Sequence, residues 1–139
     1  MNNKILKRCI EISRALRPNN PVGKSHHTSF AVYKSRIVCV GMNDYKKSHP
    51  YHKIGVYEDH KGFETAYRAS LHSEVSLAIK MGLEDWNDYE IVNVRIGFDD
   101  KIRIACPCKN CEIHIIKALK PKRVFFTDNN EQFVEMNLN

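Results

Sequence analysis

Hydrophobic and polar positions in the first third of the chain predict an amphipathic helix followed by a β-hairpin. In residues 3–17, apolar residues recur on one stripe at helical spacing, and basic residues occupy most other positions. Residues 28–33 and 36–41 are two β-rich runs, and the two residues between them are enough for a tight turn. The basic side of the helix is open to two interpretations: a solvated surface, or a surface that faces phosphates.

The rest of the chain predicts two further helices and three further strands. Residues 42–70 come first and lack clear periodicity. Loops of this length in a compact domain are usually functional or partly structured. The later elements are expected as a helix capped by Ser70 and ended by Gly82, a strand over 91–98, a short extended piece over 101–105, a helix over 108–119, and strands over 124–127 and 133–138.

This order of elements predicts an α/β fold in which a mixed sheet is covered by helices on both faces. The length favours a single domain over residues 1–139. Only a few residues separate strands 124–127 and 133–138, whereas a parallel crossover needs a dozen or more. We therefore expect the last two strands to form an antiparallel hairpin.

Composition indicates which cellular compartment and which class of partner to expect. The five cysteines are an odd number, and three of them fall within six residues, which favours a reducing compartment and a metal site over disulfides. No apolar run approaches the length of a membrane span, and the first residues lack a signal-peptide core, so we expect a cytoplasmic protein without a membrane partner. The net charge of +6 is compatible with a polyanionic partner such as DNA.

Two short motifs offer the ligands of a zinc ion. His72 supplies a nitrogen, and Glu74 supplies a carboxylate two residues later; Cys108 and Cys111 supply two sulfurs at a spacing that can grip one metal. A catalytic zinc uses three protein ligands and leaves a fourth position open, and zinc prefers nitrogen and sulfur. Both motifs are expected to begin helices, where free N–H groups favour thiolates. The sequence thus predicts a Zn²⁺ site with Glu74 beside it as the base.

A closed structural site is the alternative, with Cys106 as a fourth ligand. One residue, Pro107, separates Cys106 from Cys108, and alternate residues of an extended segment point in opposite directions. We therefore expect Cys106 to lie near the zinc site without being a ligand. A second metal site at His49, His52 and His60 is disfavoured, because no cysteine or carboxylate cluster accompanies these histidines.

The pattern His-x-Glu…Pro-Cys-x-x-Cys is the signature of zinc deaminases, and the chain resembles the cytidine deaminase superfamily. In element order the resemblance covers roughly residues 28–127. It implies a three-layer α/β/α fold with a mixed five-stranded sheet, zinc held by His72, Cys108 and Cys111, and hydrolytic deamination with Glu74 moving the protons. The expected C-terminal hairpin departs from the AID/APOBEC and tRNA adenosine deaminases, in which a helix makes that crossover.

The resemblance also implies where a substrate binds. Asn43, in Gly41-Met42-Asn43, matches the family's G-x-N, whose asparagine contacts the nucleoside sugar; from the residues alone, a turn asparagine in a left-handed conformation is an equal alternative. After Asn43 the sequence departs from the pattern of deoxycytidylate deaminases. The candidate substrate-binding residues are Asn43, Tyr45, Lys46, Lys47, His49, Tyr51, Ser73 and Cys106.

Tyrosines and lysines alternate between residues 45 and 67, and this feature bears on the substrate class. Aromatic side chains beside cations hold single-stranded nucleic acids, although the same aromatics can also anchor a loop to its own domain. We expect deamination of cytosine to uracil, first within single-stranded or flipped-out DNA, second in dCMP or a related free nucleotide, and third of adenosine in RNA. A zinc-stabilised nucleic-acid-binding module without turnover is the non-enzymatic alternative.

Overall fold

The structure is a computed structural model that describes residues 1–45, 72–82 and 85–138. Its elements are α1 (Asn3–Leu16) with a following 3-10 turn (Arg17–Asn19), β1 (His26–Tyr33), β2 (Arg36–Met42), α3 (Ser73–Met81), β3 (Glu90–Ile96), β4 (Ile102–Arg103), α4 (Lys109–Cys111), a π-helical segment (Glu112–Ile116), α5 (Lys117–Leu119), β5 (Arg123–Thr127) and β6 (Phe133–Glu135). For the described residues, the predicted order of helices and strands is therefore confirmed.

One mixed sheet runs through the centre of the molecule in the order β2-β1-β3-β5-β6. β1 is antiparallel to β2 and to β3, and β5 runs parallel to β3. β6 returns antiparallel to β5, which confirms the expected C-terminal hairpin. The main path has the five strands expected; β4, which lies in the predicted short extended piece, pairs with β3 as a sixth.

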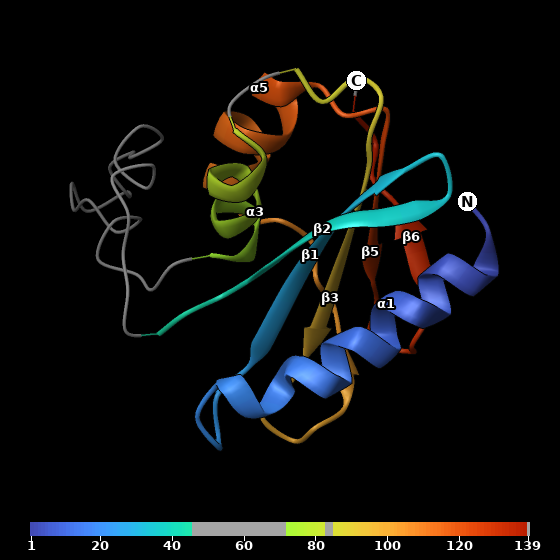
Figure 1. Cartoon of the computed structure of the whole chain (residues 1–139). Helices are drawn as coiled ribbons and strands as arrows, with labels where there is room; N and C mark the ends of the chain where they lie inside the picture. Colours follow the sequence, from blue (N-terminus) through green and yellow to red (C-terminus); the bar gives the residue numbers. More distant parts are fainter. Residues whose placement is uncertain (46–71, 83–84, 139) are drawn as a thin grey trace.

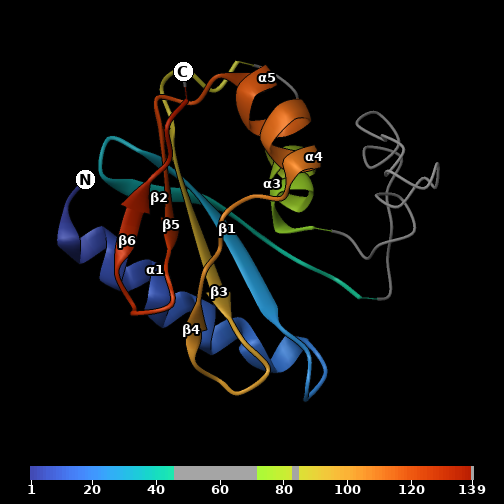
Figure 2. The same cartoon turned by 180° about the vertical axis from the view of Figure 1, so that it is seen from behind.

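Helices pack on both faces of this sheet. Successive side chains of a strand point to opposite faces, and β1 buries apolar side chains on both faces. Phe30 and Val32 of β1 belong to the apolar cluster that also contains Cys9 of α1. The intervening Ala31 belongs to a second cluster, with residues of α3, the π-helical segment and α5. Figures 1 and 2 show α1 crossing one face, while α3 and α5 lie side by side over the other.

The amphipathic stripe of α1 is confirmed, and it decides where the basic side of this helix lies. Cys9 is completely buried, and Ile5 and Ile12 pack against the same cluster. α1 therefore covers the face of the sheet opposite to α3. Its basic residues therefore belong to a helix on the other side of the sheet from α3, which begins directly after His72.

A glycine fixes the position of α3 over the sheet. A Cβ atom at Gly41 of β2 would lie 2.5 Å from the backbone nitrogen of Leu77 and 2.7 Å from the carbonyl oxygen of Ser73. Real Cβ atoms do not come that close, so only glycine lets α3 approach β2 at this point. Gly82 ends the helix as predicted, with a positive φ of 85°.

Several predicted boundaries are wrong in detail. The N-cap of α3 is His72 and not Ser70, because His72 has an extended backbone and the helix begins at Ser73. β3 ends at Ile96, two residues short of the prediction, since the chain turns over residues 98–100 to reach β4. β6 ends at Glu135, although Met136 and Leu138 still pack on the apolar cluster of α3. In the described part of the chain, no helix is long and apolar enough to cross a membrane.

Candidate metal centre

Three predicted ligands converge where α3 and α4 begin. Nδ1 of His72 lies 3.6 Å from Sγ of Cys108 and 3.4 Å from Sγ of Cys111, and the three ligand atoms all lie within 4.8 Å of one another. Bond lengths to zinc of 2.0–2.1 Å for nitrogen and 2.3 Å for sulfur place two tetrahedral ligand atoms about 3.6 Å apart. The nitrogen–sulfur distances therefore fit a zinc ion, and the site is compatible with this metal.

Helix caps place the nitrogen and one of the sulfurs. His72 is the N-cap of α3, with φ −81° and ψ 152°, and its carbonyl accepts the hydrogen bond of Ser76 N–H at 2.9 Å. Cys108 is the N-cap of α4, with φ −64° and ψ 162°, and its sulfur accepts from Cys111 N–H at 3.4 Å. Both side chains thus project from the ends of helices instead of from their sides.

Cys111 is positioned by its burial in the apolar core. It is completely buried, and the π-helical segment that follows contributes Ile115 and Ile116 to the same apolar cluster. π-helical turns inside α-helices occur frequently at functional sites. The helix after Cys108 is continuous to Leu119, as predicted, but its π-helical part was not predicted.

The protonation of the three ligands is strongly coupled. A hydrogen bond from Cys111 and a further one from His72 lower the pKa of Cys108 to about 4. The same contact and burial raise the pKa of Cys111, and the hydrogen bond with Cys108 raises the pKa of His72. One thiolate is therefore already favoured, and binding of a metal requires the loss of the remaining protons.

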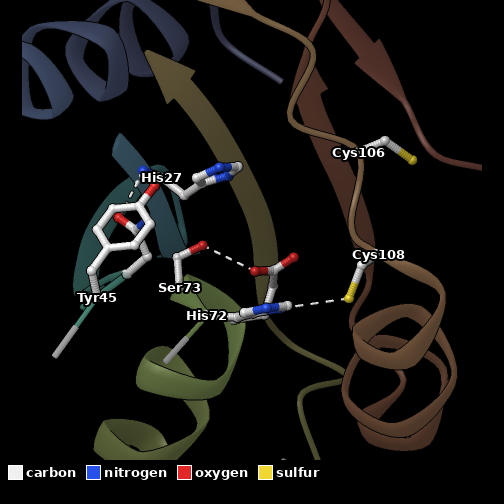
Figure 3. A pocket seen from close by; sticks show the side chains of 8 residues that line it. His27, Tyr45, His72, Ser73, Cys106 and Cys108 are labelled. Atoms are coloured by element: carbon white, nitrogen blue, oxygen red, sulfur yellow. Dashed lines mark hydrogen bonds between the residues drawn. The ribbon is translucent and has the colours of Figure 1, made fainter. Parts of the chain in front are cut away.

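A cavity of about 220 Å³ opens beside these ligands. Figure 3 shows the sulfur of Cys108 directed toward His72, with Tyr45 and His27 on the opposite side of the view. The cavity is large enough for a small planar ring, and it is lined by His27, Asn43, Tyr45, His72, Ser73, Glu74, Cys106 and Cys108.

Glu74 belongs to the first turn of α3, lines this cavity and is only 7% exposed. Two residues of a regular helix lie about 200° apart, but His72 precedes the helix, so both side chains reach one cavity. Burial raises the pKa of Glu74. A carboxyl group with a raised pKa exchanges protons closer to neutral pH, as a general acid–base group requires.

The number of hydrogens available for hydrogen bonds around Glu74 also favours a raised pKa of this carboxyl group. Four contacts join Glu74, Ser73, Ser29 and Asn93 in a closed ring. When Glu74 is ionised, two hydroxyl hydrogens and one amide N–H must serve four contacts. Uptake of a proton by the Glu74 carboxylate supplies the fourth hydrogen, so the ring favours the carboxylate as a proton acceptor.

Asn43 lines the cavity but is largely occupied by its own fold. Its Oδ1 accepts from Nδ2 of Asn20 at 2.8 Å and from the backbone N–H of His27 at 3.0 Å. Its Nδ2 donates to the carbonyl of Ser25 at 3.3 Å. Within the described residues, one amide hydrogen of Asn43 remains for a ligand. Asn43 has no positive φ, so the alternative of a left-handed turn asparagine is wrong.

The other predicted substrate contacts divide into those at the cavity and those outside the described residues. Tyr45 lines the cavity and donates its hydroxyl hydrogen to Ser25 O, while the Lys24 ammonium lies 5.9 Å from its ring centre. Ser73 and Cys106 also line it. Lys46, Lys47, His49 and Tyr51, together with His52 and His60, lie outside the described residues.

Cys106 is separate from the ligand group, as expected. Its sulfur points away from His72 and Cys108 in Figure 3. Among the residues that the structure describes, the group able to hold a metal consists of His72, Cys108 and Cys111. Within the described part of the chain, Cys106 therefore does not complete a closed site with four protein ligands.

Three cavity or near-cavity residues were not predicted: His27, Ser29 and Asn93. Burial and the nearby Arg95 lower the pKa of His27 to about 4, so its ring is neutral. Ser29 and Asn93 are direct neighbours across β1 and β3. The available signal was weak: Asn93 is the only uncharged polar residue in its strand, and His27 and Ser29 alternate with residues of the other face.

No protein-family model matches the chain, and no curated protein matches it.

Proposed function

We propose that this protein is a zinc-dependent deaminase that hydrolyses cytosine to uracil. The main support is that the ligand atoms of His72, Cys108 and Cys111 lie within 4.8 Å of one another, beside a cavity that Glu74 also lines. These are the residues of the zinc-deaminase signature. The sheet with helices on both faces, and both motifs at helix starts on one face, support a cytidine deaminase-like fold.

The chemistry divides between the metal and the chain. Zinc, when bound by His72, Cys108 and Cys111, supplies a Lewis acid that makes water a nucleophile at neutral pH. Glu74 accepts a proton from the attacking water and delivers it to the ring nitrogen of cytosine. A second proton transfer by Glu74 lets the amino group leave as ammonia, so the C–N bond is replaced by a C–O bond.

The walls of the cavity suit a base and part of its sugar. Tyr45 offers an aromatic surface, and its hydroxyl is already bonded to Ser25 O, which holds the ring in place. Asn43 has one free amide hydrogen for an acceptor of the substrate. His27 adds a neutral ring. The choice of cytosine over adenine rests on the resemblance to cytidine deaminases.

Cytosine within DNA is the first substrate form, and it is supported by the net charge of +6. A free nucleotide or nucleoside is the second candidate, and two features of the fold favour it. The antiparallel β5–β6 pair differs from the helical crossover that the resemblance assigns to the polynucleotide-acting AID/APOBEC and tRNA adenosine deaminases. The basic side of α1 also lies on the face of the sheet away from the cavity.

A panel of substrates tests the proposal. The zinc-loaded protein is incubated with dCMP, cytidine, and single- and double-stranded DNA and RNA that contain cytosine, and ammonia and uracil are measured. We expect release of both products from at least one cytosine substrate, and none after the metal is removed. A nucleic-acid-binding module would bind without releasing ammonia from any substrate, and that result would refute the proposal.

A further inference from the structure

Four buried side chains from three elements form a closed ring behind the cavity. The hydroxyl of Ser29 on β1 lies 2.8 Å from the hydroxyl of Ser73 and 2.7 Å from Oδ1 of Asn93 on β3. Ser73 Oγ lies 3.0 Å from Oε1 of Glu74, and Asn93 Nδ2 lies 3.5 Å from Oε2. All four residues are at most 7% exposed.

The ring fixes both oxygens of Glu74 from different directions. Ser73 reaches Oε1 from the same helix, and Asn93 reaches Oε2 from the neighbouring sheet. Ser29 contacts both of these side chains, and no hydrogen bond joins it to Glu74. Because Asn93 turns its oxygen toward Ser29, its amide nitrogen faces the carboxyl group.

This arrangement ties the carboxyl group to the sheet as well as to α3. A glutamate side chain has three rotatable bonds, so a freely rotating Glu74 would spend only part of the time in the orientation that proton transfer requires. Apolar residues would fill the same positions of β1 and β3 without any need for partners, whereas buried hydroxyl and amide groups need them. The polar ring is thus placed where the orientation of one carboxyl group matters.

We propose that Ser29 and Asn93 are positioning residues that hold the Glu74 carboxyl group in the orientation for proton transfer. This inference rests on the proposed deaminase function. Neither residue needs to touch the substrate, and neither lines the cavity. Their loss should therefore lower kcat while KM and zinc content stay nearly unchanged.

The principal test compares Ser29→Ala with Ser13→Ala. Ser13 is also completely buried, but it lies on α1, and its hydroxyl has no hydrogen-bond partner within the described residues. Misplacement of a catalytic group can cost up to about 10²-fold in rate. We expect kcat to fall at least about tenfold in Ser29→Ala, with KM within about twofold, and to stay unchanged in Ser13→Ala. Wild-type kcat in Ser29→Ala would overturn the inference.

A matched pair separates the hydroxyl from the space it fills. Ser29→Thr and Ser29→Val have nearly the same shape, but only threonine keeps the hydroxyl. We expect Ser29→Thr to recover most of the kcat that Ser29→Val loses, at equal zinc content. Equal kcat values for the two variants would show that packing alone accounts for Ser29.

A stability measurement tests the ring without any turnover. Urea unfolding of Ser29→Ala, Glu74→Gln and the double variant should give non-additive changes in stability, because residues that belong to one hydrogen-bond network couple through their shared partners, here Ser73 and Asn93. The same cycle with Ser13→Ala should be additive. An additive Ser29–Glu74 cycle would refute the ring, whereas wild-type protein inactive on the whole substrate panel would refute only the deaminase function.

Discussion

Nδ1 of His72 lies 3.4 Å from Sγ of Cys111, although the two residues are 39 positions apart in the sequence. The two side chains are positioned in different ways. His72 has an extended backbone at the N-cap of α3, and Cys111 is buried in the core. This distance, and the 3.6 Å from the same nitrogen to Sγ of Cys108, match the spacing of nitrogen and sulfur ligands around a tetrahedral zinc ion. We therefore expect these three residues to bind a metal ion.

Purified protein should contain about one zinc per chain. Cys111→Ala removes one of three ligands and should lose most of the metal, which elemental analysis of dialysed samples measures. Cys106→Ala is the matched control, because Cys106 lies two residues from a ligand and outside the ligand group. If Cys106→Ala loses zinc as completely as Cys111→Ala, the site is a closed structural one and the proposed catalytic role of the zinc fails.

Stability should fall as the pH is lowered from 6.5 toward 4, in part because of His26. Burial and the nearby Arg17 lower the pKa of His26 from 6.5 to about 4. Its Nδ1 lies 2.6 Å from Asn20 Nδ2, an amide nitrogen that can only donate, so the folded state needs the neutral ring. The unfolded chain takes up a proton below pH 6.5 that the folded chain does not, and this difference opposes folding.

The magnitude follows from the size of the shift. Between pH 6.5 and 4, His26 should remove up to about 3 kcal/mol from the free energy of unfolding. Urea unfolding across this range measures it, with His26→Gln as the comparison. We expect the variant to depend less steeply on pH, by about one proton. Parallel pH profiles for the two proteins would contradict the assignment.

Gly41→Ala should disturb both the fold and the metal site. Its Cβ would meet the backbone of Leu77 at 2.5 Å and of Ser73 at 2.7 Å, so α3 must move away from β2. Overpacking of this kind typically costs about 1–3 kcal/mol. Thermal unfolding and zinc content report the effect. Val38→Ala on the same strand is the control, since Val38 is 51% exposed and should matter little. A stable Gly41→Ala protein with full zinc content would disprove this close contact.

The substrate form can be decided by the salt dependence of binding. Each phosphate contact releases counterions, so loss of one contact lowers the slope of log K against log salt by about 1. If DNA is the substrate, Lys46→Ala and Lys47→Ala should flatten this slope, and Tyr45→Ala should weaken DNA deamination without loss of zinc. Lys4→Ala, on the opposite face of the sheet, should change neither. A specificity constant for dCMP well above that for an oligonucleotide would exclude DNA as the preferred form.

Much of the fold was predictable because strands and helices carry local patterns. The stripe of α1, the apolar runs of β1 to β3 and the short link before β6 each depend on neighbouring residues alone. The N-cap of α3 was mispredicted for a physical reason. Ser70 has the better capping side chain, but His72 takes the extended cap position from which its ring reaches the cysteines.

The candidate site was predictable only in part. His72, Glu74, Cys108 and Cys111 have recognisable chemistry and spacing. The ring behind Glu74 does not, because Ser29 and Asn93 are 64 residues apart and meet only through the register of β1 and β3. Serine and asparagine are common in loops, so neither residue type indicates a site by itself. The cross-strand register had to be known first.

The most direct test of the account is turnover by Glu74→Gln at full zinc content. Glutamine keeps the shape of the side chain and removes the proton acceptor. We expect the variant to bind zinc and fold like the wild type, and to lose at least about 10²–10⁴-fold in ammonia release from the best cytosine substrate of the panel. Near-wild-type ammonia release by the zinc-loaded variant would contradict the assignment of Glu74 and, with it, the proposed mechanism.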